Sequence, residues 1–103
     1  MNYRHGDLSF HPINELPKGL KEIKHKGEYV LAYGEHTGHK HKIVAEKMQI
    51  FQDGNGRYYL KVNNSATITH EEHKTITLRP GIYRQEQELE RDAFLNEIKK
   101  VVD

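Results

Sequence analysis

Apolar and polar residues alternate along most of the first 88 positions, and this period of two is typical of β-strands with one buried face. Glycine, proline and asparagine interrupt the alternation at short intervals, as they do in turns. Pro12 is expected to end the first strand or to lie at a sheet edge, and Pro17 and Gly19 predict a loop over residues 14–27. Strands are predicted at residues 8–11, 28–33, 39–45, 48–52, 57–62, 66–70, 75–78 and 82–88.

One turn has an especially clear signal. Asp53-Gly54-Asn55-Gly56 separates two alternating segments, and Asn and Gly accept the positive φ that tight hairpins require. We therefore expect an antiparallel hairpin whose turn lies at the surface, away from any functional site. Valine at Gly54 and Gly56 is expected to lower stability, because a β-branched residue resists positive φ.

The pattern changes near the C-terminus, where apolar residues recur with helical spacing. A helix is predicted from about Arg91 or Asp92, with one apolar face formed by Phe94, Leu95, Ile98, Val101 and Val102. The 103 residues are long enough for one domain with one modest core. The predicted fold is mainly β, a small β-barrel or sandwich over residues 1–103 with one C-terminal α-helix.

Composition describes a soluble globular protein, with 30% charged residues, 35% hydrophobic residues and a net charge of +1. No apolar run approaches the roughly 18 residues of a membrane span, and there is no signal-peptide core, so a cytoplasmic location is expected. Residues 18–26 are only mildly basic and are expected to form a solvated loop or edge strand; a nucleic-acid partner is not expected. The chain has no cysteine, so a metal could be held only by His, Asp or Glu.

Histidine is the residue type that points to chemistry. The chain has eight histidines, and five of them fall into two short runs, at residues 36–41 and 70–73. Neutral imidazole is the commonest side-chain metal ligand and the usual acid or base near pH 7. Two such runs in one small domain predict a shared site.

Strand geometry brings three of these side chains to the interior. His39 and His41 share a strand face with Ile43, while the lysines between them point the other way. His70 shares a face with Ile68 in the same manner, and a buried imidazole needs a partner for each ring nitrogen. The predicted metal ligands are His39, His41, His70 and, reaching back across a turn, His73.

Other residues near these runs are candidates for catalysis. Three carboxylates and one phenol could supply a further ligand, a hydrogen bond or a general base: Glu46, Glu71, Glu72 and Tyr83. Glu46 would need a bulge to reach the histidine face, and Tyr83 is also a natural core residue. The isolated histidines, His5, His11 and His25, are expected at the surface, so that their replacement by alanine leaves metal uptake intact.

The segment around His39 resembles the first sequence motif of the cupins. The matching positions are Gly34, His39, His41, Glu46 and Gly54, although each glycine interval is off by one. The second cupin motif is not reproduced, because Ile82 and Tyr83 follow Pro80-Gly81 where a histidine is expected. This resemblance covers about twenty residues and implies a small barrel with an interior divalent metal.

The whole chain resembles a set of short uncharacterised bacterial and phage proteins. The shared features are Gly6-Asp7, the segments at 34–41 and 70–73, Pro80-Gly81 with Tyr83, and a C-terminal Val-X-Asp. The resemblance implies that His39, His41, His70 and His73 form the site, and it implies no reaction.

Three classes of function remain open from the sequence. The first is a metalloprotein that binds a divalent transition metal (Zn, Fe, Ni, Cu or Mn) and could act as an enzyme on a small-molecule ligand. The second is a non-enzymatic metal- or pH-sensing module or a phage assembly component. The third is a metal-free hydrolase or ribonuclease that uses a histidine pair as acid and base. Association into a homo-oligomer is compatible with each.

Overall fold

The computed structural model describes residues 2–33, 40–71 and 73–87, and this part of the chain is mainly β. Ten strands follow one another along the described chain: β1 (Tyr3–His5), β2 (Leu8–Ile13), β3 (Lys21–Ile23), β4 (Glu28–Tyr33), β5 (Lys40–Val44), β6 (Met48–Gln52), β7 (Tyr58–Val62), β8 (Ala66–Thr69), β9 (Ile76–Leu78) and β10 (Gly81–Gln87). The predicted C-terminal helix falls at residues outside the described range. Among the residues that are described, no helix is long and apolar enough to cross a membrane.

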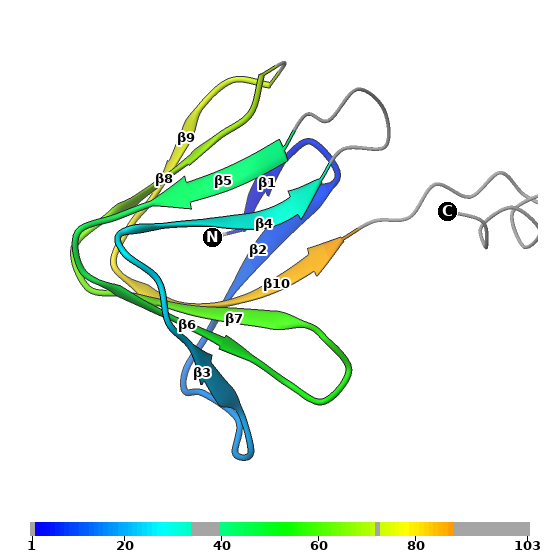
Figure 1. The fold of residues 1–103 in the computed structure, drawn as a ribbon, viewed down its shortest axis with the longest axis vertical. Helices are drawn as coiled ribbons and strands as arrows, with labels where there is room; N and C mark the ends of the chain where they lie inside the picture. The colour runs from blue at the N-terminus through cyan, green and yellow to red at the C-terminus, as the bar shows by residue number, and fades with distance from the viewer. Residues whose placement is uncertain (1, 34–39, 72, 88–103) are drawn as a thin grey trace, which may run out of the picture.

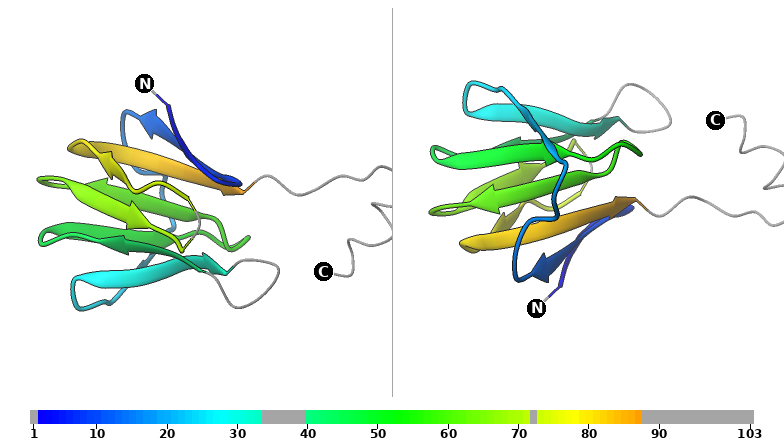
Figure 2. Two further views of the ribbon diagram at one scale, coloured as in Figure 1. Left: turned by 90° about the horizontal axis from the view of Figure 1, so that it is seen from above. Right: turned by 90° about the horizontal axis from the view of Figure 1, so that it is seen from below.

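The strands form two antiparallel sheets that face each other (Figures 1 and 2). The larger sheet has the order β1-β2-β10-β7-β6-β3, and the smaller one has the order β4-β5-β8-β9. Each sheet keeps two edge strands within the described part of the chain, so the strands do not close into a barrel. Of the two architectures expected from the sequence, the sandwich is therefore correct and the closed barrel is wrong.

Apolar residues from both sheets pack into one core between them. The larger sheet supplies, among others, Leu8, Phe10 and Leu60, and the smaller supplies Ile43 and Ile68; all five are completely buried. In β5 and β8 every second residue is buried, which is the alternation that predicted these strands.

β1 was not predicted, and β2 runs further than expected. β3 lies within residues 18–26 and at an edge of the larger sheet, so the edge strand, one of the two expectations for this segment, is correct. β1 has only three residues, too few to show a period. β2 continues through Pro12, which ends neither the strand nor its pairing with β10. Because β1 pairs only with Leu8–Phe10, β2 has one neighbour at Pro12, and a proline is tolerated there.

The hairpin between β6 and β7 confirms its sequence signal. Asp53 holds the turn, because its carboxylate accepts hydrogen bonds from the backbone N–H groups of Asn55 and Arg57, both at 2.9 Å. Gly56 has a φ of 88°, whereas Gly54 has no positive φ. The expectation that both glycines are needed for positive φ is therefore wrong for Gly54.

Candidate functional site

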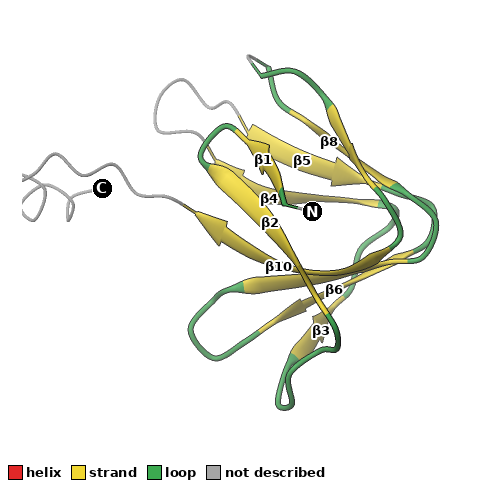
Figure 3. Cartoon of the chain, turned by 180° about the vertical axis from the view of Figure 1, so that it is seen from behind, coloured by secondary structure: helices red, strands yellow, loops and turns green. Residues whose placement is uncertain are grey.

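Four histidines gather at one end of the sandwich, and we call His5, His41, His70 and His73 the histidine cluster. His5 ends β1, His41 lies on β5, His70 follows β8, and His73 lies in the β8–β9 loop. The β1–β2 turn and the β8–β9 loop meet at this end of the molecule (Figure 3), since the Gly6 backbone of the turn lies against the His73 ring.

The four rings are in mutual contact. The closest ring centroids are those of His41 and His70 at 4.4 Å, His70 and His73 at 4.5 Å, and His5 and His41 at 5.0 Å. The remaining three pairs lie 5.7–6.2 Å apart. The structure thus brings together three of the four predicted ligands, and the fourth, His39, lies outside the described residues.

A chain of hydrogen bonds runs through the buried half of the cluster. The Asp7 carboxylate accepts from His41 Nε2 at 3.1 Å, and His41 Nδ1 lies 2.9 Å from His5 Nδ1. Gln87, at the end of β10, donates its amide to the other Asp7 oxygen at 2.9 Å. His5 and His41 are each only 2% exposed, while His70 is half-buried and His73 is exposed.

The carboxylate determines which ring nitrogens carry protons. Asp7 can only accept, so His41 Nε2 carries the hydrogen and a neutral His41 must accept at Nδ1. His5 Nδ1 then donates to His41, and His5 Nε2 is left with a lone pair. That nitrogen is buried and has no hydrogen-bond partner of normal geometry in the described part of the chain. A buried lone pair of this kind is unusual in a folded protein.

Burial lowers the pKa of the two buried histidines, His5 and His41. The pKa of His5 is lowered to about 4. Desolvation by burial is the larger cause, and repulsion from a protonated His41 is the second. An interaction with the Lys74 backbone carbonyl opposes this shift only partly. Burial and the neighbouring His70 also lower the pKa of His41, although Asp7 raises it. The two buried rings therefore present uncharged nitrogens.

Gly6 makes the close approach of these rings feasible. A Cβ atom at Gly6 would lie 2.7 Å from His73 Nε2 and 3.0 Å from His41 Cε1. Its φ of 64° is also in the left-handed region that favours glycine. The Gly6-Asp7 turn thus supplies both the space for the cluster and its carboxylate.

The candidate catalytic residues from the sequence lie mostly elsewhere. Glu46 is exposed in the β5–β6 connection, and Glu72 is not among the described residues. The Tyr83 hydroxyl donates to the Arg79 carbonyl at 2.8 Å, so Tyr83 belongs to the core and is not a hydrogen-bond donor to the cluster. Glu71 alone lies beside a cluster histidine, at His70.

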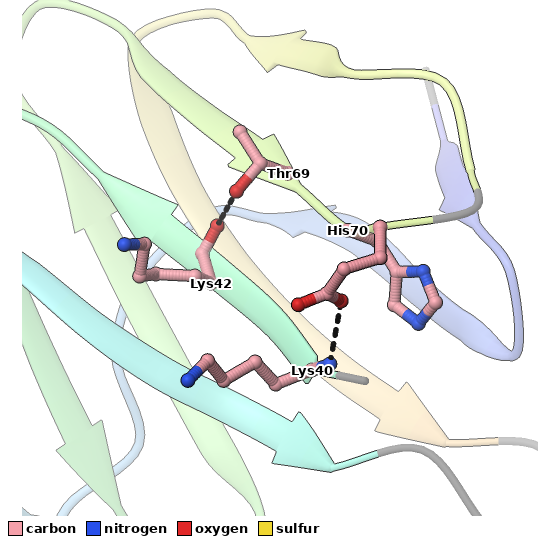
Figure 4. Close-up of a pocket in the computed structure, with 5 residues that line it drawn as sticks. Lys40, Lys42, Thr69 and His70 are labelled. Carbon is pink, nitrogen blue, oxygen red and sulfur yellow. Dashed lines mark hydrogen bonds between the residues drawn. The ribbon is translucent and has the colours of Figure 1, made fainter. Parts of the chain in front are cut away.

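Figure 4 shows the small cavity beside His70, about 260 Å³ in volume. It is lined by Lys40, Lys42, Thr69, His70 and Glu71. The Glu71 carboxylate accepts a hydrogen bond from the Lys40 backbone N–H at 3.0 Å, which fastens the β8–β9 loop to the beginning of β5. Glu71 therefore has a structural role that fixes His70 close to His41.

His5 is the site residue that sequence reasoning placed wrongly. It was expected at the surface, but it is buried in the cluster because β1 pairs with β2 and turns its alternate residues inward. His25 also has partners, the Met48 carbonyl at 3.1 Å and the Gly27 N–H at 3.0 Å. His11 is half-buried and lies 3.0 Å from the Ser9 hydroxyl, outside the cluster. The Gly6-Asp7 pair noted in the resemblance was the one signal close to His5.

The cluster meets some requirements of a metal centre. Two nitrogens that bind one metal at about 2.0–2.1 Å stand about 3.0–3.4 Å apart, and the two Nδ1 atoms of His5 and His41 lie at 2.9 Å. However, no group of three or more His, Asp or Glu side chains within residues 2–33, 40–71 and 73–87 converges with the geometry that holds a metal ion. His5 and His41 could together supply two nitrogen ligands to a metal ion. A third ligand would have to come from a side chain that moves or from a residue outside the described ranges.

The molecule is thus an antiparallel β-sandwich with the histidine cluster and the Asp7 carboxylate at one end. Residues 4–88 match the model of a family described as Domain of unknown function (DUF8820), and the chain belongs to this family. The match gives no support to a cupin relationship. No curated protein and no solved structure matches the chain.

Proposed function

We propose that this domain binds one divalent transition metal ion through the histidine cluster. The observation that carries the proposal is the buried pair of neutral imidazoles, whose Nδ1 atoms lie 2.9 Å apart. Only a deprotonated ring nitrogen can bind a metal, and burial keeps these two rings uncharged at neutral pH.

The groups behind the two rings support this assignment. A metal-binding histidine usually donates its other N–H to a carboxylate or a backbone carbonyl. His41 has Asp7 in this position, and His5 has the Lys74 carbonyl close to its ring. If both Nδ1 atoms bound a metal, the His5 proton would move to Nε2, and the nitrogen that now lacks a partner would become a donor.

The remaining ligands would come from the exposed side of the cluster. His70 and His73 are less buried than the first pair, so their side chains have room to turn toward a metal. His39 is two residues from His41 and is the further candidate. Imidazole ligands suit Zn, Fe, Ni, Cu or Mn(II), and a site with an open position could bind a substrate oxygen or activate water.

Metal analysis of the untagged protein tests the proposal. We expect about one equivalent of metal per chain, with uptake abolished in His41→Ala and strongly reduced in His5→Ala and His70→Ala. His11→Ala is the matched control and should bind normally. His25→Ala is unsuitable, because His25 holds a loop through two hydrogen bonds. A folded wild-type protein that takes up none of the five metals would overturn the proposal.

Asp7→Asn separates a metal centre from a structural cluster. Loss of the carboxylate behind a metal-binding histidine typically weakens affinity 10–100-fold. We therefore expect Asp7→Asn to remain folded and to bind metal more weakly by about this factor. Unchanged affinity in this variant would show that His41 is not a ligand oriented by Asp7.

The alternative of metal-free acid–base catalysis has one observation in its favour. The Asp7–His41 hydrogen bond orients an imidazole as a general base requires. His41 is only 2% exposed, however, so the half-buried His70 would have to exchange the proton with the substrate. Hydrolysis of model esters or RNA that persists in the presence of a chelator, and is lost in Asp7→Asn, would favour this function.

A further inference from the structure

A second cavity is bordered by strands of both sheets. It has a volume of about 280 Å³ and is lined by Leu31 of β4, Tyr58 of β7 and the last three residues of β10, together with the β6–β7 turn. The ends of β4 and β10 and this turn lie on the same side of the molecule (Figure 1). None of the described histidines lines this cavity, although Gln87 of its wall donates a hydrogen bond to Asp7 beside the histidine cluster.

Gln85 gives this cavity an unused hydrogen-bond acceptor. Its side chain lines the cavity, and the residue is only 6% exposed. Its Oε1 atom is buried and has no hydrogen-bond partner in the described part of the chain. A buried amide oxygen without a partner costs about 1–3 kcal/mol. Because this oxygen has almost no accessible surface, the Gln85 side chain would have to turn toward the cavity, and a hydroxyl or amino donor on a ligand would then remove this cost.

Arg57 gives the rim of the cavity a positive charge. The two neighbouring polar residues on β10 are already engaged, Glu86 with Arg84 at 2.9 Å and Gln87 with Asp7 at 2.9 Å. Among the described residues, no carboxylate pairs with the Arg57 guanidinium. Arginine binds a carboxylate through two parallel hydrogen bonds, so the rim is suited to an anionic group.

Leu31 and Tyr58 form the apolar part of a lining that is otherwise mostly polar. Leu31 is 4% exposed and belongs to the core. The Tyr58 ring is fixed by contact with the Tyr29 ring, and the hydroxyl oxygens of the two tyrosines lie 3.1 Å apart. These two side chains offer contact for an aromatic or branched aliphatic group.

We propose that this cavity binds a small carboxylate that carries an apolar group and a hydroxyl or amino donor. Arg57 binds the carboxylate, Gln85 accepts from the donor, and the apolar group packs against Leu31 and Tyr58. The volume of about 280 Å³ is just below the usual range of ligand pockets, which limits the ligand to roughly a dozen non-hydrogen atoms. This site needs no metal, so it stands or falls independently of the histidine cluster.

The test uses the isotopically labelled full chain and backbone amide spectra. The probes are 3-phenyllactate, mandelate and phenylalanine; 3-phenylpropionate lacks the donor, and 3-phenyl-1,2-propanediol lacks the carboxylate. We expect 3-phenyllactate to shift the amides of the cavity residues and to bind about tenfold more tightly than 3-phenylpropionate, since loss of the donor leaves Gln85 unpaired.

Two variants assign the contacts. Gln85→Leu should keep its fold, because the amide oxygen it removes has no partner, and should bind 3-phenyllactate no better than 3-phenylpropionate. Arg57→Gln should weaken the binding of both 3-phenyllactate and 3-phenylpropionate and leave the binding of the diol unchanged. Arg79→Gln, which lies just before the first residue of β10 and far from Gln85 along the strand, should not change the binding of any probe. If none of the three donor-bearing carboxylates shifts these amides, or if both variants bind as the wild type does, the proposal is wrong.

Discussion

Gly6 is the residue on which the packing of the histidine cluster depends most directly. Its lack of a side chain lets the β1–β2 turn lie against His41 and His73, and its positive φ reverses the chain between His5 and Asp7. Gly6 therefore helps to position His5, His41 and His73, which are far apart in the sequence.

Replacing Gly6 by alanine should harm both the fold and the site. The left-handed backbone costs about 1–2 kcal/mol for a residue with a side chain, and the Cβ would approach His73 Nε2 to 2.7 Å. We expect Gly6→Ala to lower the free energy of unfolding by about 2 kcal/mol or more and to weaken metal binding. Gly19→Ala is the control, since Gly19 has a φ of 81° and open space around it. Equal losses in both variants, measured by denaturant titration, would contradict this role of Gly6.

His5 makes the stability of the metal-free protein depend on pH. The pKa of His5 lies at about 4 in the folded protein and near its ordinary value of 6.5 when unfolded. The unfolded chain therefore binds the extra proton first, and stability that is complete above pH 6.5 is lost as the pH falls toward 4. The full loss from His5 is about 3 kcal/mol, and the lowered pKa of His41 acts in the same direction.

Urea titrations between pH 7.5 and 4 in the presence of a chelator measure this effect. His5→Asn keeps an amide donor close to the position of Nδ1 but does not titrate, so its stability should fall less steeply with acidification. A variant profile parallel to that of the wild type would show that His5 is not the group responsible.

At the level of elements, β4 to β10 could be predicted from the sequence, the three-residue β9 included, whereas β1 could not. β4–β8 follow the expected ranges to within a residue or two. β1 has three residues, of which only Tyr3 and His5 face inward, and a single inward histidine resembles any exposed one in sequence. The clustering of His41 and His70 was foreseeable because each lies in line with an aliphatic face, and His73 was expected to reach them across the turn that follows His70. The contribution of His5 depends on β1 pairing with β2, which local sequence does not encode.

The β6–β7 turn allows a test at this level. Gly56→Val should lower the free energy of unfolding by about 1–2 kcal/mol, because Gly56 has a φ of 88°. Gly54→Val should have little effect, since Gly54 has no positive φ and a Cβ atom at this position would meet no other atom within 4 Å among the described residues. Thermal unfolding distinguishes the two variants, and the metal content per folded chain should be unchanged in both. Loss of metal in folded Gly56→Val would mean that the turn acts on the cluster.

At the scale of the whole molecule, the partition of strands between two sheets was beyond sequence reasoning. β2 pairs with β10, so Leu8 lies opposite Gln87 and Ile13 lies opposite Ile82. Period-two patterning states which residues face the core, but it does not state which strands are neighbours. A barrel and a sandwich share the same pattern, and only the edge strands β1, β3, β4 and β9 distinguish them here.

Hydrogen exchange should report how the cluster connects the two sheets. β1 is a three-residue edge strand and should exchange quickly, whereas β7 and β10 lie inside the larger sheet and should exchange slowly. Since His5 joins β1 to β5 of the other sheet, metal binding should slow exchange in β1 and in the β8–β9 loop. Slowing that is spread evenly over all strands, or absent from β1, would argue against a metal bridging His5 and His41.

The hydrogen bond between Asp7 and Gln87 spans 80 positions of the chain, and this has a consequence for biosynthesis. During translation His5 and Asp7 leave the ribosome early. Gln87, the last residue of β10, leaves it after the other nine described strands. Until then the Asp7 carboxylate, which binds the His41 ring, lacks its second side-chain partner. The full set of hydrogen bonds around Asp7 can therefore form only after β10 has been synthesised, so the last described strand completes a network that begins at the first.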